Sequence, residues 1–350
     1  MNKKCLVAGG GIAGTLLAWF LSEKKIDFVL IDDDARHSAS RIAAGIVHPI
    51  TGRRLARSWM SDEFIPFAAA TYAALEKHSG RQFYFPMGIR ELLKEKKELN
   101  DWMSLSEGKP GEASVKVATD TPEGVRTFPF AIAVDGAFLD TNVFLHAVKL
   151  LLQQRGQVLK GAVSAFTVHD DGGRVMHGET EADLVVFCEG YKGMNNPYWK
   201  NLPWQPSKGE LLLIHCPGLA AREILNRKIF VLPAGNGLFK VGSTYAWDTL
   251  NEVPTSPARE KLTAELHKII DLPFEIIDHQ AAVRPTVKER RPFLGFHPNH
   301  PAIGIFNGLG TKGVMNGPWL AHHLASHIAE GLPLIPEADV MRFSGELAVT

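Results

Sequence analysis

The sequence predicts an α/β fold in which both ends of the chain build one parallel sheet and an antiparallel β-rich domain is inserted between them. Three observations support this prediction. A buried strand, a glycine-rich turn and a helix open the chain at residues 4–23. Strand patterns joined by tight turns fill residues 208–243, which is typical of an antiparallel sheet. A strand, a glycine-rich segment and a helix return at residues 302–330, so we expect the first domain to be discontinuous.

The composition is that of an ordinary globular protein. The 350 residues are 45% hydrophobic and 22% charged, enough for about two domains with their own cores and no need of disulfides or metals. The 38 basic and 38 acidic side chains cancel, so no global field attracts a phosphate backbone. We expect no nucleic-acid partner, although a local basic groove stays open. No window of 18 apolar residues occurs, so we expect no membrane span.

The cysteines and the first residues predict a cytoplasmic protein. Cys5, Cys188 and Cys216 are odd in number and far apart, which is typical of reduced thiols, and the first two lie in apolar runs that favour simple packing. Lys3 and Lys4 precede an apolar stretch with the outline of a signal peptide. Glycines interrupt that stretch and no small-x-small cleavage site follows, so we expect no export.

A dinucleotide-binding turn follows the first strand. Gly9, Gly11 and Gly14 form a G-x-G-x-x-G pattern, and the second strand ends at Asp32, 18 residues after Gly14. Gly9 permits the tight turn, Gly11 lets backbone N–H groups approach a pyrophosphate, and Gly14 lets the helix pack close to the sheet. Asp32 accepts hydrogen bonds from ribose hydroxyls and repels a 2′-phosphate. The pattern therefore predicts a Rossmann-like domain that binds FAD or NAD rather than NADP.

The other elements follow from hydrophobic periodicity and from turn and cap residues. We expect strands at residues 4–8, 28–31, 83–85, 89–93, 162–169, 174–178, 182–188, 208–215, 229–232, 238–243, 274–283 and 302–306. We expect helices at residues 15–23, 68–78, 139–155, 256–271 and 318–330. Pro66 suits a first helical turn, and Asp140 or Thr141 caps the third helix. Residues 97–127 are polar and predict surface connections with short strands, and residues 307–317 predict a loop.

This order of elements divides the chain into two domains. Residues 1–80, 139–195 and 284–350 are assigned to the cofactor domain, and residues 81–138 and 196–283 to the antiparallel β-rich substrate domain. A plain NAD dehydrogenase usually keeps its nucleotide domain contiguous, whereas large flavoproteins often close over FAD from both chain ends. The discontinuous domain therefore favours FAD.

Segments spread over nearly the whole chain carry a family resemblance. Besides the N-terminal motif they are residues 39–45, 162–163, 241–248, 284–295 and 308–313. Together they resemble the FAD-dependent amine and amino-acid oxidases of the D-amino-acid oxidase, glycine oxidase and sarcosine oxidase type. The match is most specific at residues 284–295, which keep the family's Arg-Pro, acid, Pro and Gly, with Glu289 where Asp is usual. The last loop departs from the family at Leu309 and Thr311, so a histidine there is absent.

The resemblance implies FAD and the residues that hold it. The expected FAD-binding residues are Gly9, Gly11, Ile12, Ala13, Gly14, Asp32, Ser40, Arg41, Ala44, Gly45, Val163, Gly190, Arg284, Gly308, Gly310, Thr311, Lys312 and Gly313. Some family members link the flavin to a cysteine near the C-terminus, and others to a histidine before Ala-Ala-Gly. The last cysteine here is Cys216, and Ile42 stands before Ala43. We therefore expect non-covalent FAD.

The resemblance also implies oxidation of the C–N bond of a small-molecule amine or amino acid. The flavin accepts a hydride at N5, and water hydrolyses the imine. A substrate carboxylate calls for a fixed cation, preferably an arginine. The expected catalytic residues are Arg54, Arg57, Tyr245, Arg284 and Lys312, with Tyr245 closing the substrate site. The loop before the last helix is expected to stabilise negative charge on the reduced flavin. The electron acceptor is left open between O2 and another molecule.

Alternative functions can be compared with particular residues of the sequence. A flavin hydroxylase or reductase typically shows Gly-Asp before its last long helix, where this chain has Asn307-Gly308. A non-catalytic FAD-binding subunit is the second alternative, and similar tRNA-modifying oxidases keep an amine carried on RNA in view. His323 and His327 are four residues apart, but Leu324 stands where a metalloprotease needs glutamate, so we expect no metal.

Overall fold

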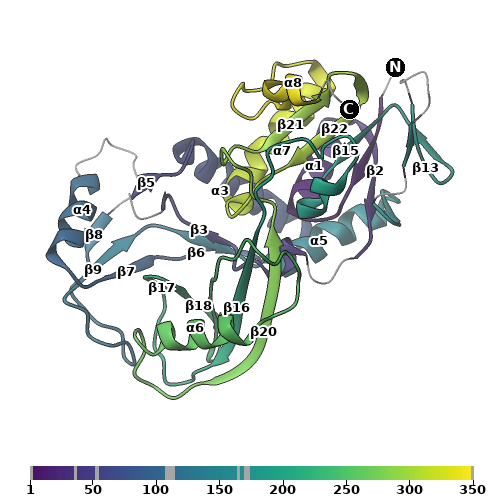
Figure 1. The fold of residues 1–350 in the computed structure, drawn as a ribbon. Coiled ribbons are helices and arrows are strands. Elements are labelled where there is room, and N and C mark those ends of the chain that lie inside the picture. Colours follow the sequence, from purple (N-terminus) through teal and green to yellow (C-terminus); the bar gives the residue numbers. More distant parts are fainter. Residues whose placement is uncertain are drawn as a thin grey trace.

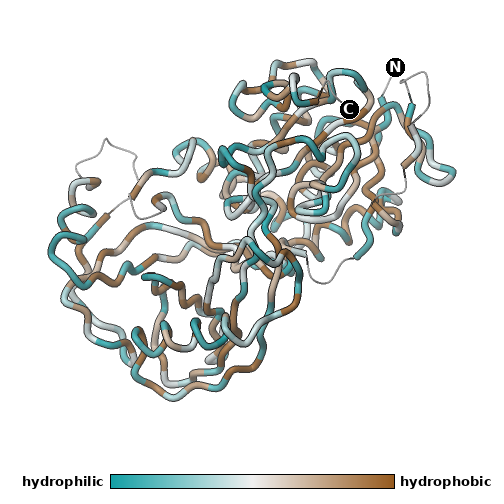
Figure 2. The backbone as a smooth tube through the Cα atoms, viewed as in Figure 1, coloured by the Kyte–Doolittle hydropathy of each residue, from teal (hydrophilic) through white to brown (hydrophobic). Residues whose placement is uncertain are grey.

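The computed structural model describes residues 3–34, 38–51, 55–106, 115–163, 166–168 and 174–347. Figure 1 shows two lobes, with the chain's N- and C-terminal ends both on the lobe that contains helices α1 (Ile12–Glu23) and α7 (Gly313–Glu330). In Figure 2 hydrophobic stretches run along the strands of both lobes, and many outer loops are hydrophilic. Each lobe therefore has its own hydrophobic interior.

A six-stranded sheet forms the centre of the first lobe. Its order is β11-β2-β1-β15-β22-β21, and every neighbouring pair is parallel except β21, which runs antiparallel to β22. The strands are β1 (Lys4–Ala8), β2 (Asp27–Asp32), β11 (Val158–Lys160), β15 (Leu184–Phe187), β21 (Phe293–His297) and β22 (His300–Asn307). Strand β15 lies between β1 from the N-terminal part and β22 from the C-terminal part. The prediction that both parts of the chain build one parallel sheet is confirmed.

Both faces of this sheet are buried. Cys5 and Val7 of β1 pack with the helices α1, α7, α3 (Ser61–Ser79) and α5 (Thr141–Gln154). Leu6 and Ala8 face the other side, where they join a core with Trp199 and the C-terminal turn η2 (Val340–Phe343). Helix α8 (Ser344–Leu347), the turn η1 (Gly190–Asn195) and a small sheet of β12 (Thr167–Val168), β13 (Val175–His177) and β14 (Thr180–Ala182) complete this lobe. The apolar runs of the predicted strands are therefore explained by burial on two faces.

An eight-stranded sheet forms the second lobe. Its order is β20-β16-β19-β18-β17-β7-β9-β8, and its neighbours are antiparallel except for the pair β17 and β7. The strands are β20 (Glu275–Arg284), β16 (Ser207–His215), β19 (Leu238–Gly242), β18 (Phe230–Gly235), β17 (Ile224–Asn226), β7 (Ile89–Leu93), β9 (Phe130–Val134) and β8 (Val115–Val117). Leu262 and Leu266 of α6 (Ser256–Leu266) pack on this sheet. The predicted antiparallel β-rich sheet is confirmed.

Short strands connect the two lobes. A three-stranded sheet has the order β3-β10-β6, and a two-stranded ribbon pairs β4 with β5. Their bounds are β3 (Ile46–Val47), β10 (Ala137–Leu139), β6 (Tyr84–Pro86), β4 (Ile50–Thr51) and β5 (Ala56–Arg57). The short helix α2 (Ala39–Ile42) precedes β3. These segments bring the chain from the parallel sheet to the long antiparallel sheet.

Several predicted boundaries were wrong. Helix α4 (Lys96–Ser106) occupies part of the segment expected to be surface connections. Leu99, Trp102 and Met103 give this polar helix one apolar stripe that packs on the second lobe. Helix α3 begins at Ser61, so Pro66 lies inside it, and α6 ends at Leu266 rather than Asp271. Strand β21 had not been expected.

The most consequential difference is the start of helix α7. It begins at Gly313, five residues before the expected start at Pro318. A Cβ atom on Gly317 would lie 3.0 Å from Leu16 Cδ1 of α1, and one on Gly313 would lie 3.2 Å from Ile12 Cγ2. These glycines therefore allow two helices to pack closely, whereas the sequence pattern had indicated a flexible loop.

A change at Gly14 tests the close packing of α1 on the turn before it. A Cβ at this position would lie 1.9 Å from the carbonyl oxygen of Gly9, which is backbone and cannot rotate away. We predict that Gly14→Ala lowers the free energy of unfolding, measured in urea, by about 1–3 kcal/mol. Gly345→Ala, whose Cβ meets nothing within 4 Å, should change it by less than about 0.5 kcal/mol. Equal stability of the two variants would contradict this account.

Candidate functional site

One large cavity lies where the two lobes meet. Its volume is about 1080 Å³, which is at the upper end of the range for small-molecule and cofactor sites. Its wall is formed by the turn after β1, helix α2, strand β16, the end of β20 and the segment between β22 and α7. Such a cavity has room for a long ligand that touches both sheets.

Most residues predicted for the site line this cavity. They are Gly9, Gly11, Ile12, Ala13, Asp32, Ser40, Arg41, Ala44, Gly45, Arg57, Val163, Gly190, Tyr245, Arg284, Gly308, Gly310, Thr311, Lys312 and Gly313. Gly14 does not line it, because Gly14 lies behind the turn against the Gly9 carbonyl. Arg54 lies outside the described residues.

The turn after β1 presents a helix N-terminus to the cavity. Gly9 adopts a φ of 116° and its N–H donates to the Ile31 carbonyl at 2.8 Å. The N-cap residue of α1 is Gly11, which has no side chain to cap the helix. The Ile12 N–H donates to Ser40 Oγ at 3.0 Å. This arrangement places partial positive charge at the cavity wall, which fits a pyrophosphate.

Asp32 is held in place beside this turn. Its carboxylate is buried and accepts a hydrogen bond from Lys149 Nζ at 2.8 Å. Lys149 also pairs with Asp34. Burial opposes the charge of Lys149, but the two carboxylates together raise its pKa. A Cβ on Gly10 would lie 2.4 Å from the Asp32 carboxylate, so only glycine leaves room for this carboxylate to face a ribose. Sequence reasoning missed Lys149, because nothing local links helix α5 to β2.

A second helix N-terminus opens on the same cavity. Helix α7 starts directly after Lys312 and has no acidic residue in its first turn. Asn307 holds the preceding segment: its Oδ1 accepts from Gly308 N–H at 2.8 Å, and its Nδ2 donates to the Gly190 carbonyl at 2.9 Å. Asn316 Oδ1 lines this end, is buried, and has no hydrogen-bond partner among the described residues. An unsatisfied buried group of this kind fits a polar ligand in the cavity.

Lys312 brings a partly buried ammonium group to the cavity. Its Nζ donates to the His48 carbonyl at 3.1 Å, and burial lowers the pKa of Lys312 to about 8. The His48 ring is fixed, because Nδ1 accepts from Ile50 N–H at 3.2 Å and Nε2 lies 2.9 Å from Glu91 Oε1. Asn226 Nδ2 donates to the same Glu91 oxygen at 2.6 Å. His48 and Asn226 line the cavity and were missed from the sequence, since four separate segments meet here.

Arg284 brings a partly buried guanidinium to the cavity. Its Nη2 donates to Ser243 Oγ at 2.7 Å and to the Thr244 carbonyl at 3.2 Å, and its Nη1 donates to that carbonyl at 3.3 Å. The guanidinium carbon lies 4.4 Å from the centre of the Tyr245 ring. Burial lowers the pKa of Arg284, and no acidic group among the described residues forms an ion pair with it. A Cβ on Gly209 would lie 1.9 Å from Nη2, so this glycine makes the space for the guanidinium.

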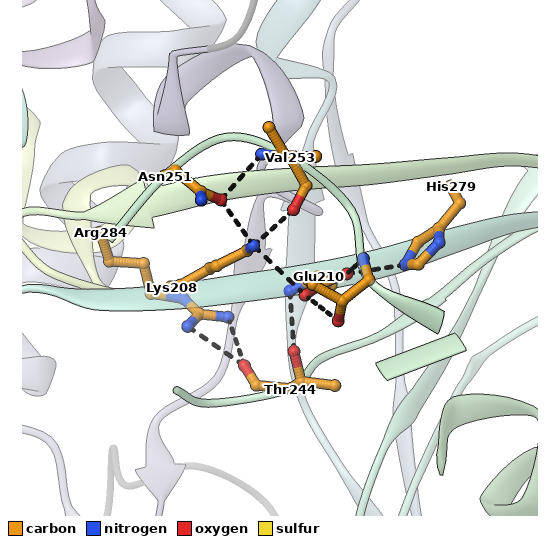
Figure 3. A network of polar contacts seen from close by, with 8 residues as sticks. Lys208, Glu210, Thr244, Asn251, Val253, His279 and Arg284 are labelled. Atoms are coloured by element: carbon orange, nitrogen blue, oxygen red, sulfur yellow. Dashed lines mark hydrogen bonds and ion pairs between the residues drawn. The ribbon is translucent and has the colours of Figure 1, made fainter. Parts of the chain in front are cut away.

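The strap, residues 243–255 after β19, carries the partners of Arg284 and is anchored on β16 (Figure 3). Lys208 and Glu210 are both nearly fully buried. Lys208 Nζ donates to Asn251 Oδ1 at 2.8 Å and to the Val253 carbonyl. Glu210 accepts from the N–H and hydroxyl of Thr255 at 2.8 and 2.9 Å, and it lies 2.9 Å from His279 Nε2. This buried network ties the strap to β16.

Two aromatic side chains of the strap stand at the cavity wall. Tyr245 is 52% exposed and Trp247 is 58% exposed. Their rings stack with centroids 6.3 Å apart and an interplanar angle of 25°. Both residues line the cavity. Arg57, by contrast, pairs at the wall with Asp62 at 3.2 Å, so its charge is partly satisfied within the protein.

Glu189 is a further cavity residue that the sequence reasoning missed. It follows strand β15, and its Oε2 accepts from Asn196 Nδ2 at 2.8 Å. Burial raises the pKa of Glu189 to about 7, against the hydrogen bond from Asn196 and the charge of Lys192. The position after a buried strand and before Gly190 was the only local signal for it.

The described residues contain no group of three or more His, Cys, Asp or Glu side chains arranged to hold a metal ion. The three cysteines are buried and unpaired, which agrees with the packing role expected for Cys5 and Cys188. Within the described part of the chain, no helix combines the length and the apolar character needed to cross a membrane.

Comparisons with known proteins agree with this geometry. A profile of the DAO family, described as FAD dependent oxidoreductase, matches residues 4–327. Glycine oxidase of Pseudomonas putida is 24% identical over 97% of this chain and 98% of its own length. The tRNA 5-methylaminomethyl-2-thiouridine biosynthesis bifunctional protein MnmC of Caulobacter sp. is also 24% identical; the match covers 99% of this chain but 58% of that protein. The structure of L-proline dehydrogenase from P. horikoshii superimposes with a TM-score of 0.80 at 15% identity, over 98% of each chain.

The raised pKa of Glu189 predicts a pH-dependent stability. The native carboxyl keeps its proton up to about pH 7, whereas a free glutamate releases it near pH 4.5. The native state therefore binds more protons in this window, and the free energy of unfolding falls as pH rises, by about 3 kcal/mol from this group. As pH rises from about 5 to about 8, the free energy of unfolding measured in urea should fall less for Glu189→Gln than for the wild type. The exposed Glu260→Gln serves as control, and an unchanged pH dependence in Glu189→Gln would contradict the assignment.

Proposed function

Because the chain belongs to the DAO family of FAD dependent oxidoreductases, we propose that it oxidises the C–N bond of an amine or amino acid that carries a carboxylate. The C–H hydrogen leaves as hydride, the nitrogen loses a proton, and water hydrolyses the resulting C=N bond to a carbonyl compound and either ammonia, from a primary amine, or an amine, from a secondary amine. FAD supplies the hydride acceptor when it is bound. The molecule that takes electrons from reduced FAD, O2 or another acceptor, is left open.

The described residues fit FAD at both ends of the cavity. The backbone N–H groups at the start of α1 would hold the pyrophosphate, and Asp32 would hold the ribose. The start of α7 would face the flavin ring, where its positive end stabilises negative charge that gathers on reduction. Cys216, the last cysteine, is buried and does not line the cavity. We propose that FAD is bound without a covalent link.

Arg284 is the observation that supports an amine with a carboxylate. A partly buried guanidinium without an acidic partner is costly unless a ligand supplies the negative charge. Its free Nε–H and Nη1–H groups would donate stronger hydrogen bonds to a carboxylate than to a neutral group. Ser243 and Thr244 orient the guanidinium, and Tyr245 packs on its face. This arrangement would hold the substrate by its carboxylate and leave the amine-bearing carbon free to face the flavin.

The two lobes would divide this work. We propose that residues 1–80, 139–195 and 284–350 form the FAD-binding domain and that residues 81–138 and 196–283 form the substrate domain. Arg284 stands at the last residue of β20, where the second lobe returns to the first. Tyr245 and Trp247, which belong to the second lobe, would exclude bulk water from the reacting bond.

A second candidate substrate is an amine carried on a tRNA nucleotide. One relative is named for the biosynthesis of a methylaminomethyl uridine in tRNA. The exposed stack of Tyr245 and Trp247 at the cavity wall supports this candidate, because exposed aromatic rings stack on nucleobases. The net charge of zero does not favour RNA. Bleaching of the enzyme by an amine-modified tRNA but not by free amino acids would decide for it.

The visible spectrum of the purified protein tests the cofactor. We expect a yellow protein whose flavin appears in the supernatant after acid precipitation, because the attachment is non-covalent. Anaerobic addition of amines should then bleach the flavin band. A flavin that stays with the precipitate would contradict the non-covalent attachment. A bound, released FAD that no amine bleaches would favour a non-catalytic subunit instead.

Removing the charge of Arg284 tests the carboxylate site. For a carboxylate-bearing amine, Arg284→Met should lower kcat/KM by about 30-fold or more, because losing one partner of a buried charge pair costs roughly 2–5 kcal/mol. Oxidation of an amine without a carboxylate should change little. Arg81→Met, at an exposed arginine outside the cavity, is the matched control. An equal loss for both kinds of amine would show that Arg284 acts on structure and not on the carboxylate.

A further inference from the structure

Two partly buried cations reach the cavity and donate hydrogen bonds only to neutral groups in the described part of the chain. Arg284 bonds to Ser243 Oγ and the Thr244 carbonyl and lies on the Tyr245 ring. Lys312 bonds to the His48 carbonyl. Two such cations carry one more positive charge than a single carboxylate neutralises.

Each cation keeps hydrogen-bond donors for a ligand. Arg284 has five N–H groups, and its three hydrogen bonds to protein acceptors leave Nε–H and one Nη1–H without an acceptor among the described residues. Lys312 has three N–H groups, and one of them is used by His48. Each side chain can therefore bind a carboxylate of its own.

The acidic side chains of the cavity do not form ion pairs with Arg284 or Lys312. Five of them line the cavity, and each has another partner. Asp32 pairs with Lys149, Asp33 with Lys192, Glu189 with Asn196, Glu210 with Thr255 and His279, and Glu252 with Tyr191. The negative charge opposite Arg284 and Lys312 must therefore come from the ligand.

The two cations lie on one wall but are held by different parts of the protein. Gly310 N–H donates to the Pro285 carbonyl at 3.2 Å, so the segment before Lys312 touches the residue after Arg284. The Lys312 ammonium is tied to His48, between β3 and β4, whereas the Arg284 guanidinium is tied to the strap. Each cation is therefore fixed by its own acceptors in the protein.

We propose that the substrate is an amino dicarboxylate, with one carboxylate on Arg284, the second on Lys312 and the oxidised C–N bond between them. This inference rests on the proposed function and specifies its substrate class. The preference for two carboxylates comes from Lys312, because Arg284 alone serves a monocarboxylate.

Unreactive acids of matched length test the proposal on the FAD-loaded protein. Malonate, succinate and glutarate are titrated against acetate, propionate and butyrate, and binding is followed by the change in the flavin absorption band. We expect one dicarboxylate to bind at least about tenfold more tightly than the best monocarboxylate. If none does, the proposal is overturned while amine-driven bleaching still supports the proposed function.

Variants assign the preference to Lys312. Lys312→Met should remove the preference and leave the Kd of the monocarboxylates within about twofold, whereas Arg284→Met should weaken both kinds of acid. Lys228→Met, which removes another lysine of the cavity wall, should keep the preference. If Lys312→Met loses FAD, Lys312→Gln replaces it, and the wild-type titration decides the substrate class in any case. Equal weakening of both acids by the Lys312 variant would mean that the two cations share one carboxylate and would refute the proposal.

Discussion

The close packing of helices α1 and α7 is the contact on which the rest of the site depends. Gly14 lies against the Gly9 carbonyl, and Gly317 lies against Leu16, so the two helices approach each other and the sheet at van der Waals distance. Their N-terminal ends consequently open on the same cavity. Two helix N-termini give the cavity positive potential at two places, one suited to a pyrophosphate and one to charge that develops on a flavin ring.

The charged side chains at the two ends of this cavity differ in their partners. At the cofactor end Asp32 and Lys149 satisfy each other, so the carboxylate is oriented before a ligand arrives. At the other end Arg284 and Lys312 have only neutral partners among the described residues, and their pKa values are lowered by burial. An ion pair inside the protein fixes the orientation of its side chains, whereas a cation without an acidic partner favours a negatively charged ligand.

The antiparallel sheet positions Arg284, one of the two cations without an acidic partner among the described residues. Lys208 and Glu210 of β16 hold the strap through a buried polar network, and the strap in turn holds Arg284. Gly209, between them, leaves the space that the guanidinium fills. The position of Arg284 therefore depends on a buried network on a neighbouring strand. In the proposed function, the parallel sheet would contribute the cofactor end, and the antiparallel sheet would contribute the end that recognises the substrate.

The sequence by itself determined the features that depend on neighbours along the chain. The turn at Gly9, the acid at the end of β2, the Asp140 cap of α5 and the alternation of strands are local signals, and the structure contains all of them. The family's Arg-Pro segment likewise placed Arg284 at the cavity. Only the tertiary structure decided that Gly313–Gly317 form a helix, that Lys149 orients Asp32, and that His48, Glu91 and Asn226 meet beside Lys312. These contacts join residues far apart in the chain, and the free energy that fixes them comes from burial and packing, which no local pattern records.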